Sequence, residues 1–223
     1  MNQFSDNPSS IHLSDRRRWL EVAGVVLTGL GKFIFMDWLN WRLFYIVLAC
    51  LSWAVYVFLR YRENPEILAY WGFRKDNFGK VFRFILPFGV VSVLIFWLLG
   101  MWFGTNILSW HIIPILILYP IWGTIQHFLM IGLVADNLEG LTSVSLSRFG
   151  LVSLTSILFA IVHYPHWWLI LACSLLAVFY TLVYLWEKNL YVLGIFHGWL
   201  GALFFYLVLA RDSFMEVMGP LLS

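Results

Sequence analysis

Long apolar runs recur along almost the whole chain and limit what it can fold into. About 20 apolar residues form a helix that crosses roughly 30 Å of hydrocarbon, and seven stretches approach this length. The 223 residues are 61% hydrophobic and only 12% charged, unlike a water-soluble domain. We therefore predict an all-α, polytopic integral membrane helical bundle with about seven transmembrane helices. The expected spans lie near residues 20–36, 41–60, 83–104, 107–135, 147–164, 166–185 and 190–209.

Two of these spans carry residues that are unusual in a membrane helix. The first includes Glu21 and Lys32, which makes it the weakest of the seven. The fourth contains Pro114 and Pro120 and is expected to be kinked or divided. The stretch 61–83 mixes charged and aromatic residues, which predicts a loop with an amphipathic piece on the membrane surface.

The basic residues predict how the chain is oriented in the membrane. With a cytoplasmic N-terminus, all of the 14 Lys and Arg residues except Lys32, Arg42 and Arg211 fall on the cytoplasmic side. This distribution satisfies the positive-inside rule. We therefore expect an integral, multi-pass protein whose N-terminus is cytoplasmic. Its helices are expected to contact membrane lipid as a partner.

The remaining composition narrows the class of protein further. A formal net charge of +2 gives no reason to expect a nucleic-acid partner. Cys50 and Cys173 lie inside separate apolar runs, so we do not expect a disulfide framework. No internal repeat or low-complexity segment divides the chain, and we treat residues 1–223 as a single membrane domain.

Polar side chains at membrane depth are the candidate functional residues, because such positions are costly and usually carry function. Gln126 and His127 stand side by side in the fourth span. His163 follows Phe159 by four residues, so the ring and the imidazole share one helix face. His197 lies in the last span. One buried histidine is ordinarily a hydrogen-bonded packing residue, but polar positions on three separate spans suggest a shared site.

Three glycines surround the last of these histidines. Gly194, Gly198 and Gly201 flank His197 at a spacing that lets two helices approach closely. The other candidate histidines are less informative. His111 stands near the beginning of its span and is expected at the interface, and His166 follows a proline in a turn.

Two of the three polar segments resemble motifs of a known family. The CPBP (CAAX protease and bacteriocin-processing, or Abi) family of intramembrane proteases includes the type II CAAX prenyl endopeptidases. Its second motif is Phe-x-x-x-His, which Phe159 and His163 match in full. Its third motif is His-x-x-x-Asn or a variant with a small last residue. His197 matches its first position, and Gly201 stands where Asn is common.

The first motif of that family, Glu-Glu-x-x-x-Arg, is similar to this chain in position but differs in its residues. Gln126 and His127 replace the two glutamates, and Ile131 replaces the arginine, whereas Gly132 agrees with a common extension of the motif. The resemblance covers roughly residues 107–210, which we regard as a CPBP-like core.

The resemblance implies a membrane endopeptidase whose first glutamate is the general base on a water molecule. One histidine then binds or activates that water, and the third motif stabilises the oxyanion. Carried over to this chain, it implies Gln126, His127, His163 and His197 as candidate catalytic residues, with Phe159 and Gly201 on the substrate-binding side.

The substitutions in the first motif change what this site is expected to do. The Gln126 amide is not basic near neutral pH, and neither Ile131 nor Gly201 offers a polar side chain. We therefore expect a site that is weak or inactive as an endopeptidase and that binds a membrane-embedded or lipidated peptide or protein, with no cofactor.

Two alternatives stay open at this point. His127 has a competent base in its imidazole, so the chain would be an active endopeptidase through His127 or through a zinc site formed by His127, His163 and His197. The other alternative is an unrelated multispanning, transporter-type subunit. The expected topology also raises a conflict, because His163 lies ~22 Å along its helix from Arg148, nearer the outer face than His197.

Overall fold

The computed structural model describes residues 11–216, and this part of the chain consists of helices and loops without a strand, as the all-α prediction requires. Two segments, η1 and η2, are π-helical and continue α1 and α5 directly. In chain order the elements are α1 (Asp15–Gly31), η1 (Lys32–Trp38), α2 (Arg42–Glu63), α3 (Ile67–Tyr70), α4 (Phe78–Phe103), α5 (Ile112–His127), η2 (Phe128–Ala135), α6 (Asp136–Glu139), α7 (Arg148–Ile161), α8 (Trp167–Trp186) and α9 (Leu190–Leu207).

Within the described residues, six helices are long and apolar enough to cross a membrane. The segment expected near 147–164 forms a shorter apolar helix, α7, of 14 residues. At 1.5 Å per residue it is ~21 Å long. The fourth predicted span is one continuous helical stretch, Ile112–Glu139, which passes through Pro120 and becomes π-helical at Phe128.

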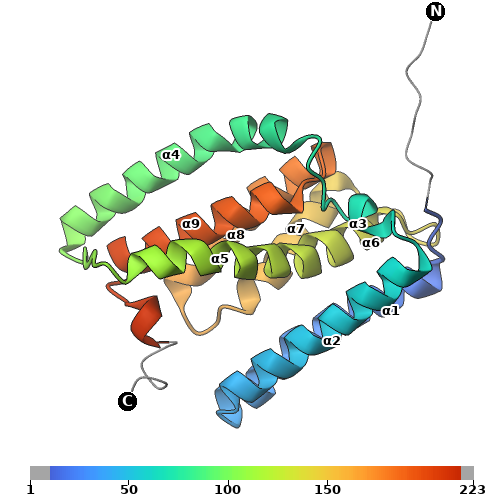
Figure 1. Cartoon of the computed structure of the whole chain (residues 1–223), viewed down its shortest axis with the longest axis horizontal. Coiled ribbons are helices and arrows are strands. Elements are labelled where there is room, and N and C mark those ends of the chain that lie inside the picture. Colours follow the sequence, from blue (N-terminus) through green and yellow to red (C-terminus); the bar gives the residue numbers. More distant parts are fainter. Residues whose placement is uncertain (1–10, 217–223) are drawn as a thin grey trace, which may run out of the picture.

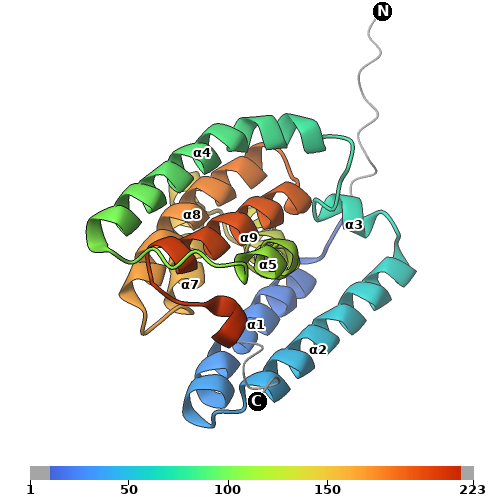
Figure 2. The ribbon, with the colours of Figure 1, turned by 60° about the vertical axis from the view of Figure 1, so that its left-hand side comes forward.

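The last helix is the centre of the bundle. In Figure 1 and Figure 2, α9 lies between α4 and α5, and α7 and α8 complete the bundle on its other side. Helix α9 is the most buried of the six long helices, as expected for a helix that is apolar on all faces. Helices α1 and α2 form a hairpin that runs along one side of this core (Figure 1).

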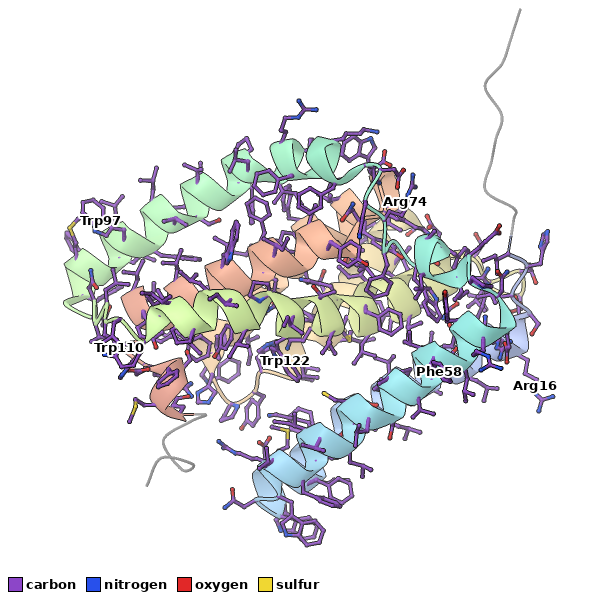
Figure 3. All side chains as sticks on the ribbon, viewed as in Figure 1. Arg16, Phe58, Arg74, Trp97, Trp110 and Trp122 are labelled. Atoms are coloured by element: carbon purple, nitrogen blue, oxygen red, sulfur yellow. The ribbon has the colours of Figure 1, made fainter. Side chains whose placement is uncertain are left out.

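One end of the bundle is basic and the other is rich in tryptophan. Figure 3 shows Arg16 and Arg74 toward one end and Trp97 and Trp110 toward the other. The loop after α2 belongs to the basic end, and its apolar residues pack against the protein. Ile67 and Trp71 are fully buried, and the Trp71 ring lies 5.0 Å from that of Phe128. The apolar side of this segment therefore fills the end of the core.

The charged residues of the first helix find partners inside the protein. Glu21 is buried and accepts hydrogen bonds from the Tyr56 hydroxyl and from Asn137 Nδ2, the latter at 2.6 Å. Arg18 is buried beside it and donates to Asn137 Oδ1 at 3.3 Å. At the other end of this helix, Lys32 pairs with an aspartate of η1. These contacts explain how a helix with several charges stays part of the bundle.

Asn137 is the centre of the polar cluster that fastens α1 to the core, so we expect Asn137→Ala to destabilise the protein strongly. The variant loses bonds to Arg18 and Glu21 and leaves both charges buried with one partner fewer, a cost of about 3 kcal/mol. Thermal unfolding of the purified protein in detergent measures it. Asn106→Ala, at an exposed asparagine, is the matched control; equal midpoints for the two variants contradict the prediction.

Candidate functional site

The two adjacent polar residues at the end of α5 have different surroundings. His127 is completely buried, and its Nε2 atom lies 3.0 Å from Nδ1 of His197. One of these imidazoles donates an N–H group and the other accepts it. Gln126 is half-buried, and its Oε1 atom is shielded from solvent without a hydrogen-bond partner among the described residues. Of the two, His127 is therefore the residue that meets the third-motif histidine.

Glycines bring α5 and α9 close enough for this contact. A Cβ atom on Gly198 would lie 2.2 Å from the Pro120 nitrogen, and one on Gly194 would lie 2.6 Å from the Thr124 Cα atom. The predicted close approach at these two glycines is confirmed. Gly201 differs, because a Cβ there would meet nothing closer than 4.0 Å.

Phe159 of α7 lies among all three histidines of the candidate site. Its ring centroid is 5.4 Å from that of His127, 5.3 Å from that of His163 and 5.7 Å from that of His197. The phenylalanine is buried, and its ring stacks on the His127 imidazole with an interplanar angle of 25°. The structure thus gathers the three motif segments around one aromatic ring.

His163 has partners of its own on α7 and α8. Its Nδ1 atom lies 2.9 Å from the carbonyl oxygen of Phe159, and its Nε2 atom lies 3.5 Å from Sγ of Cys173. Because a carbonyl oxygen only accepts, Nδ1 carries the proton and the neutral ring leaves Nε2 as the acceptor of the thiol hydrogen. Cys50 and Cys173 are both free thiols.

The two remaining motif positions hold an apolar side chain, at Ile131, and no side chain, at Gly201. Ile131 is 1% exposed and belongs to the main hydrophobic core. Gly201 follows His197 by one turn, and a Cβ atom there would lie 4.0 Å from Cδ2 of His197 and from Cδ2 of Tyr119. Neither Ile131, in η2, nor Gly201, in α9, supplies a charged group.

No zinc site is formed by the three imidazoles in this arrangement. Among the described residues, no group of three or more His, Cys, Asp or Glu side chains is placed to hold a metal ion. His127 and His197 use facing nitrogens on each other, and His163 uses both of its nitrogens elsewhere. The donor set therefore does not fit a three-histidine zinc ion, which needs one free nitrogen from each ring directed at one point.

Two residues of this site were missed in the sequence. The ring of Tyr180, in α8, lies 5.0 Å from the His127 imidazole, and its buried hydroxyl has no hydrogen-bond partner in the described part of the chain. Cys173 is the partner of His163. Cys173 and Tyr180 are seven residues apart on α8, a spacing that predicts a shared helix face. Nothing in the sequence indicates that this face meets His127.

Comparison with known families agrees with the arrangement of these segments. Residues 106–203 match the family model described as type II CAAX prenyl endopeptidase Rce1-like. The chain carries an Rce1-like domain. The matched segment includes every candidate site residue, from Gln126 to Gly201. No curated protein and no solved structure matches the chain.

The match to the Rce1-like model covers the part of the chain that carries the candidate site. The chain is a helical membrane protein with an Rce1-like domain. The three-histidine arrangement around Phe159 lies entirely within that domain.

The other candidate histidines lie away from this arrangement. His111, at the beginning of α5, is half-buried and has Nδ1 within 2.5 Å of Asp212 Oδ2. His166 is exposed at the beginning of α8. Neither side chain contacts Phe159 or the paired imidazoles in any interaction found in the structure.

Proposed function

We propose that this Rce1-like membrane protein binds a membrane-embedded or lipidated peptide or protein and cleaves it weakly or not at all. The observation that carries the proposal is the set of groups around His197. Its nearest polar partner is the His127 imidazole at 3.0 Å, whereas the family chemistry requires a carboxylate there to take a proton from water. General base catalysis contributes typically about 10²–10⁴ to a rate.

The other altered positions support the same reading. A missing oxyanion donor at Gly201 costs on the order of 10²–10³ in rate. Ile131 lies in an apolar core and provides no cation to hold a carboxylate. Phe159 still packs against three imidazoles, but the first motif no longer supplies a carboxylate.

One observation favours a second candidate, an active endopeptidase that uses His127 as its base. His127, and not Gln126, faces the second and third motif histidines through Phe159. In that mechanism the His127 imidazole takes a proton from water while the oxygen attacks the peptide carbonyl. The carbon–nitrogen bond then breaks, and the proton passes to the leaving amine.

A paired cleavage and binding assay tests the proposal. Full-length protein is reconstituted into vesicles and given a prenylated peptide or a membrane-embedded peptide, each with a photoreactive group. We expect specific crosslinking that the unlabelled peptide competes away, together with cleavage at the level of empty vesicles. Cleavage that disappears in His163→Ala but survives in His166→Ala would overturn the proposal, as would absence of competed crosslinking.

The same preparation separates the second candidate from a metal-dependent one. Cleavage lost in His127→Ala but unaffected by a chelator supports His127 as the base. Stoichiometric zinc in the purified protein that is lost in His127→Ala would contradict both the proposal and the donor geometry.

A further inference from the structure

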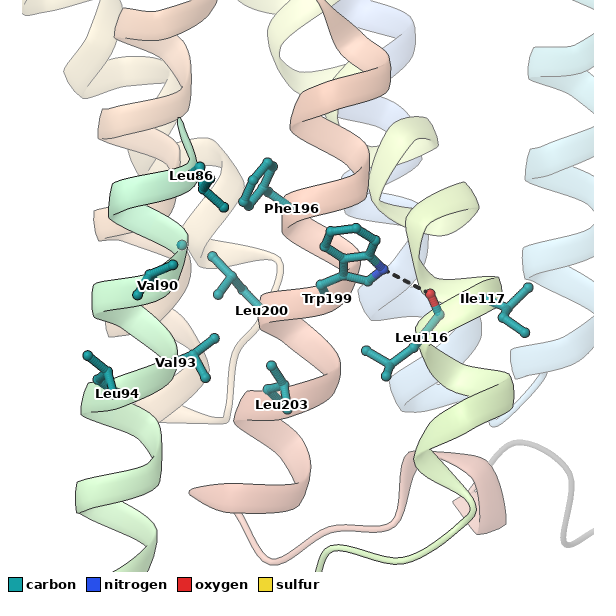
Figure 4. Close-up of a pocket in the computed structure, with 11 residues that line it drawn as sticks. Leu86, Val90, Val93, Leu94, Leu116, Ile117, Phe196, Trp199, Leu200 and Leu203 are labelled. Carbon is teal, nitrogen blue, oxygen red and sulfur yellow. Dashed lines mark hydrogen bonds between the residues drawn. The ribbon is translucent and has the colours of Figure 1, made fainter. Parts of the chain in front are cut away.

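An apolar groove lies on the lipid-facing side of the bundle, between α4 and α5, with α9 as its floor. Figure 4 shows Leu86, Val90, Val93 and Leu94 along α4 and Leu116 and Ile117 across from them. The groove has a volume of about 640 Å³, and every residue that lines it is apolar, glycine or tryptophan.

Two contacts define the floor and the far wall. A Cβ atom on Gly89 would lie 2.7 Å from the Phe196 ring, so α4 rests directly on α9 at this point. Trp199 donates from Nε1 to the Leu116 carbonyl oxygen at 3.1 Å and ties α9 to α5 (Figure 4). Val90 and Ile117 are exposed on the two rims, so the groove opens sideways into the bilayer.

A cation lies above the groove at the basic end of the bundle. Arg83 precedes Leu86 by three residues and Val90 by seven, so all three share one face of α4. Arg83 is exposed and donates from Nε to the Gly79 carbonyl oxygen at 3.1 Å. Among the described residues no carboxylate lies within 4.0 Å of its guanidinium, whereas the neighbouring Lys80 is paired with Glu187.

The shape and chemistry favour a lipid over a protein helix as the occupant. A transmembrane helix packs closely where small residues leave room for its backbone, and the one glycine of this groove is already covered by Phe196. An acyl chain needs only apolar walls. A basic residue at the predicted cytoplasmic end attracts anionic headgroups.

We propose that the groove between α4 and α5 binds an anionic phospholipid, with one acyl chain along Leu86, Val90 and Leu200 and the phosphate at Arg83. This site lies on a different face of α9 from His197 and is independent of the function of the paired histidines. The lipid would fill the space between α4 and α5, which both pack against α9.

Native mass spectrometry of the full-length protein in detergent tests this site. The protein is titrated with dioleoylphosphatidylglycerol or dioleoylphosphatidylcholine, and the apparent Kd of the first retained lipid is compared. We expect tighter binding of the anionic lipid and about a fivefold loss of that affinity in Arg83→Gln, since one basic residue near the surface contributes on the order of 1 kcal/mol.

Matched variants separate the site from general lipid adhesion. Arg62→Gln removes another exposed arginine, on the α1–α2 hairpin, and is expected to bind as the native protein does. Val90→Trp fills the groove and should weaken binding about tenfold by displacing a few methylene groups, whereas Val91→Trp, outside the lining, should not. Equal affinity for the two lipids, or equal effects of Val90→Trp and Val91→Trp, would overturn the proposal. So would a dimer that Val90→Trp dissociates.

Discussion

Gly198→Val is expected to lower the thermal unfolding midpoint by ~10 °C or to prevent folding altogether. A Cβ on Gly198 would lie 2.2 Å from the nitrogen of Pro120 and 2.4 Å from the carbonyl carbon of Tyr119. Both are backbone atoms of α5, so neither can move aside as a flexible side chain would. Overpacking typically costs about 1–3 kcal/mol, and a clash with backbone puts this variant at about 3 kcal/mol or more. That loss corresponds to roughly 6–12 °C for a chain of this size.

Gly201→Ala provides the control on the same helix. Its Cβ would meet nothing closer than 4.0 Å, so we expect an unfolding midpoint within a degree or two of the native protein. Circular dichroism of both variants in the same detergent follows the loss of helix. Equal midpoints for Gly198→Val and Gly201→Ala would mean that α5 and α9 are not in contact as described.

The spacing of these glycines shows how far sequence reasoning reached. Gly194 and Gly198 predicted a close helix approach, and the structure places the backbone of α5 against both. The partner helix was not predictable, because α5 is apolar on nearly every face and has no stripe that marks a contact. Gly201 shared the spacing, but a Cβ there would make only ordinary van der Waals contacts at 4.0 Å, so the same pattern overstated its packing role.

The identity of the residue that faces the site depended on rotation about α5. Adjacent residues point ~100° apart on a helix, so the sequence indicated that Gln126 and His127 differ but not which one faces inward. That direction is set by contacts far along the chain, with Phe159 on α7 and His197 on α9. The order of the motifs favoured Gln126 as the residue that faces the site, whereas the packing places His127 against Phe159 and His197.

An aromatic ring connects His163 and His197, which were expected at different depths. The topology placed His163 nearer the outer face, and the structure keeps it one helical turn beyond Phe159. Phe159 reaches both imidazoles, with centroids at 5.3 and 5.7 Å. Counting residues along α7 could not show this, because it does not give the reach of the Phe159 side chain between the two imidazoles.

His127→Glu is expected to raise peptide cleavage by about 10²–10⁴, the contribution of a general base, whereas Gln126→Glu leaves it at background. A carboxylate at position 127 would replace the imidazole that lies 3.0 Å from His197 Nδ1, and so would stand beside the third-motif histidine. A carboxylate at position 126 would lie around the helix from it. The measurement is the initial rate of peptide cleavage by the reconstituted variants.

Adding Gly201→Asn to His127→Glu should increase the rate by a further factor on the order of 10²–10³. A Cβ atom at position 201 would meet nothing closer than 4.0 Å, so an asparagine can be placed one turn from His197, where its amide would donate to a developing oxyanion. The double variant Gln126→Glu with Gly201→Asn has the same composition change and is the matched control. If that control gained activity while His127→Glu with Gly201→Asn did not, the family motif would outweigh the packing as a guide to the base. A loss of existing cleavage in His127→Glu would instead show that the native imidazole is already the base.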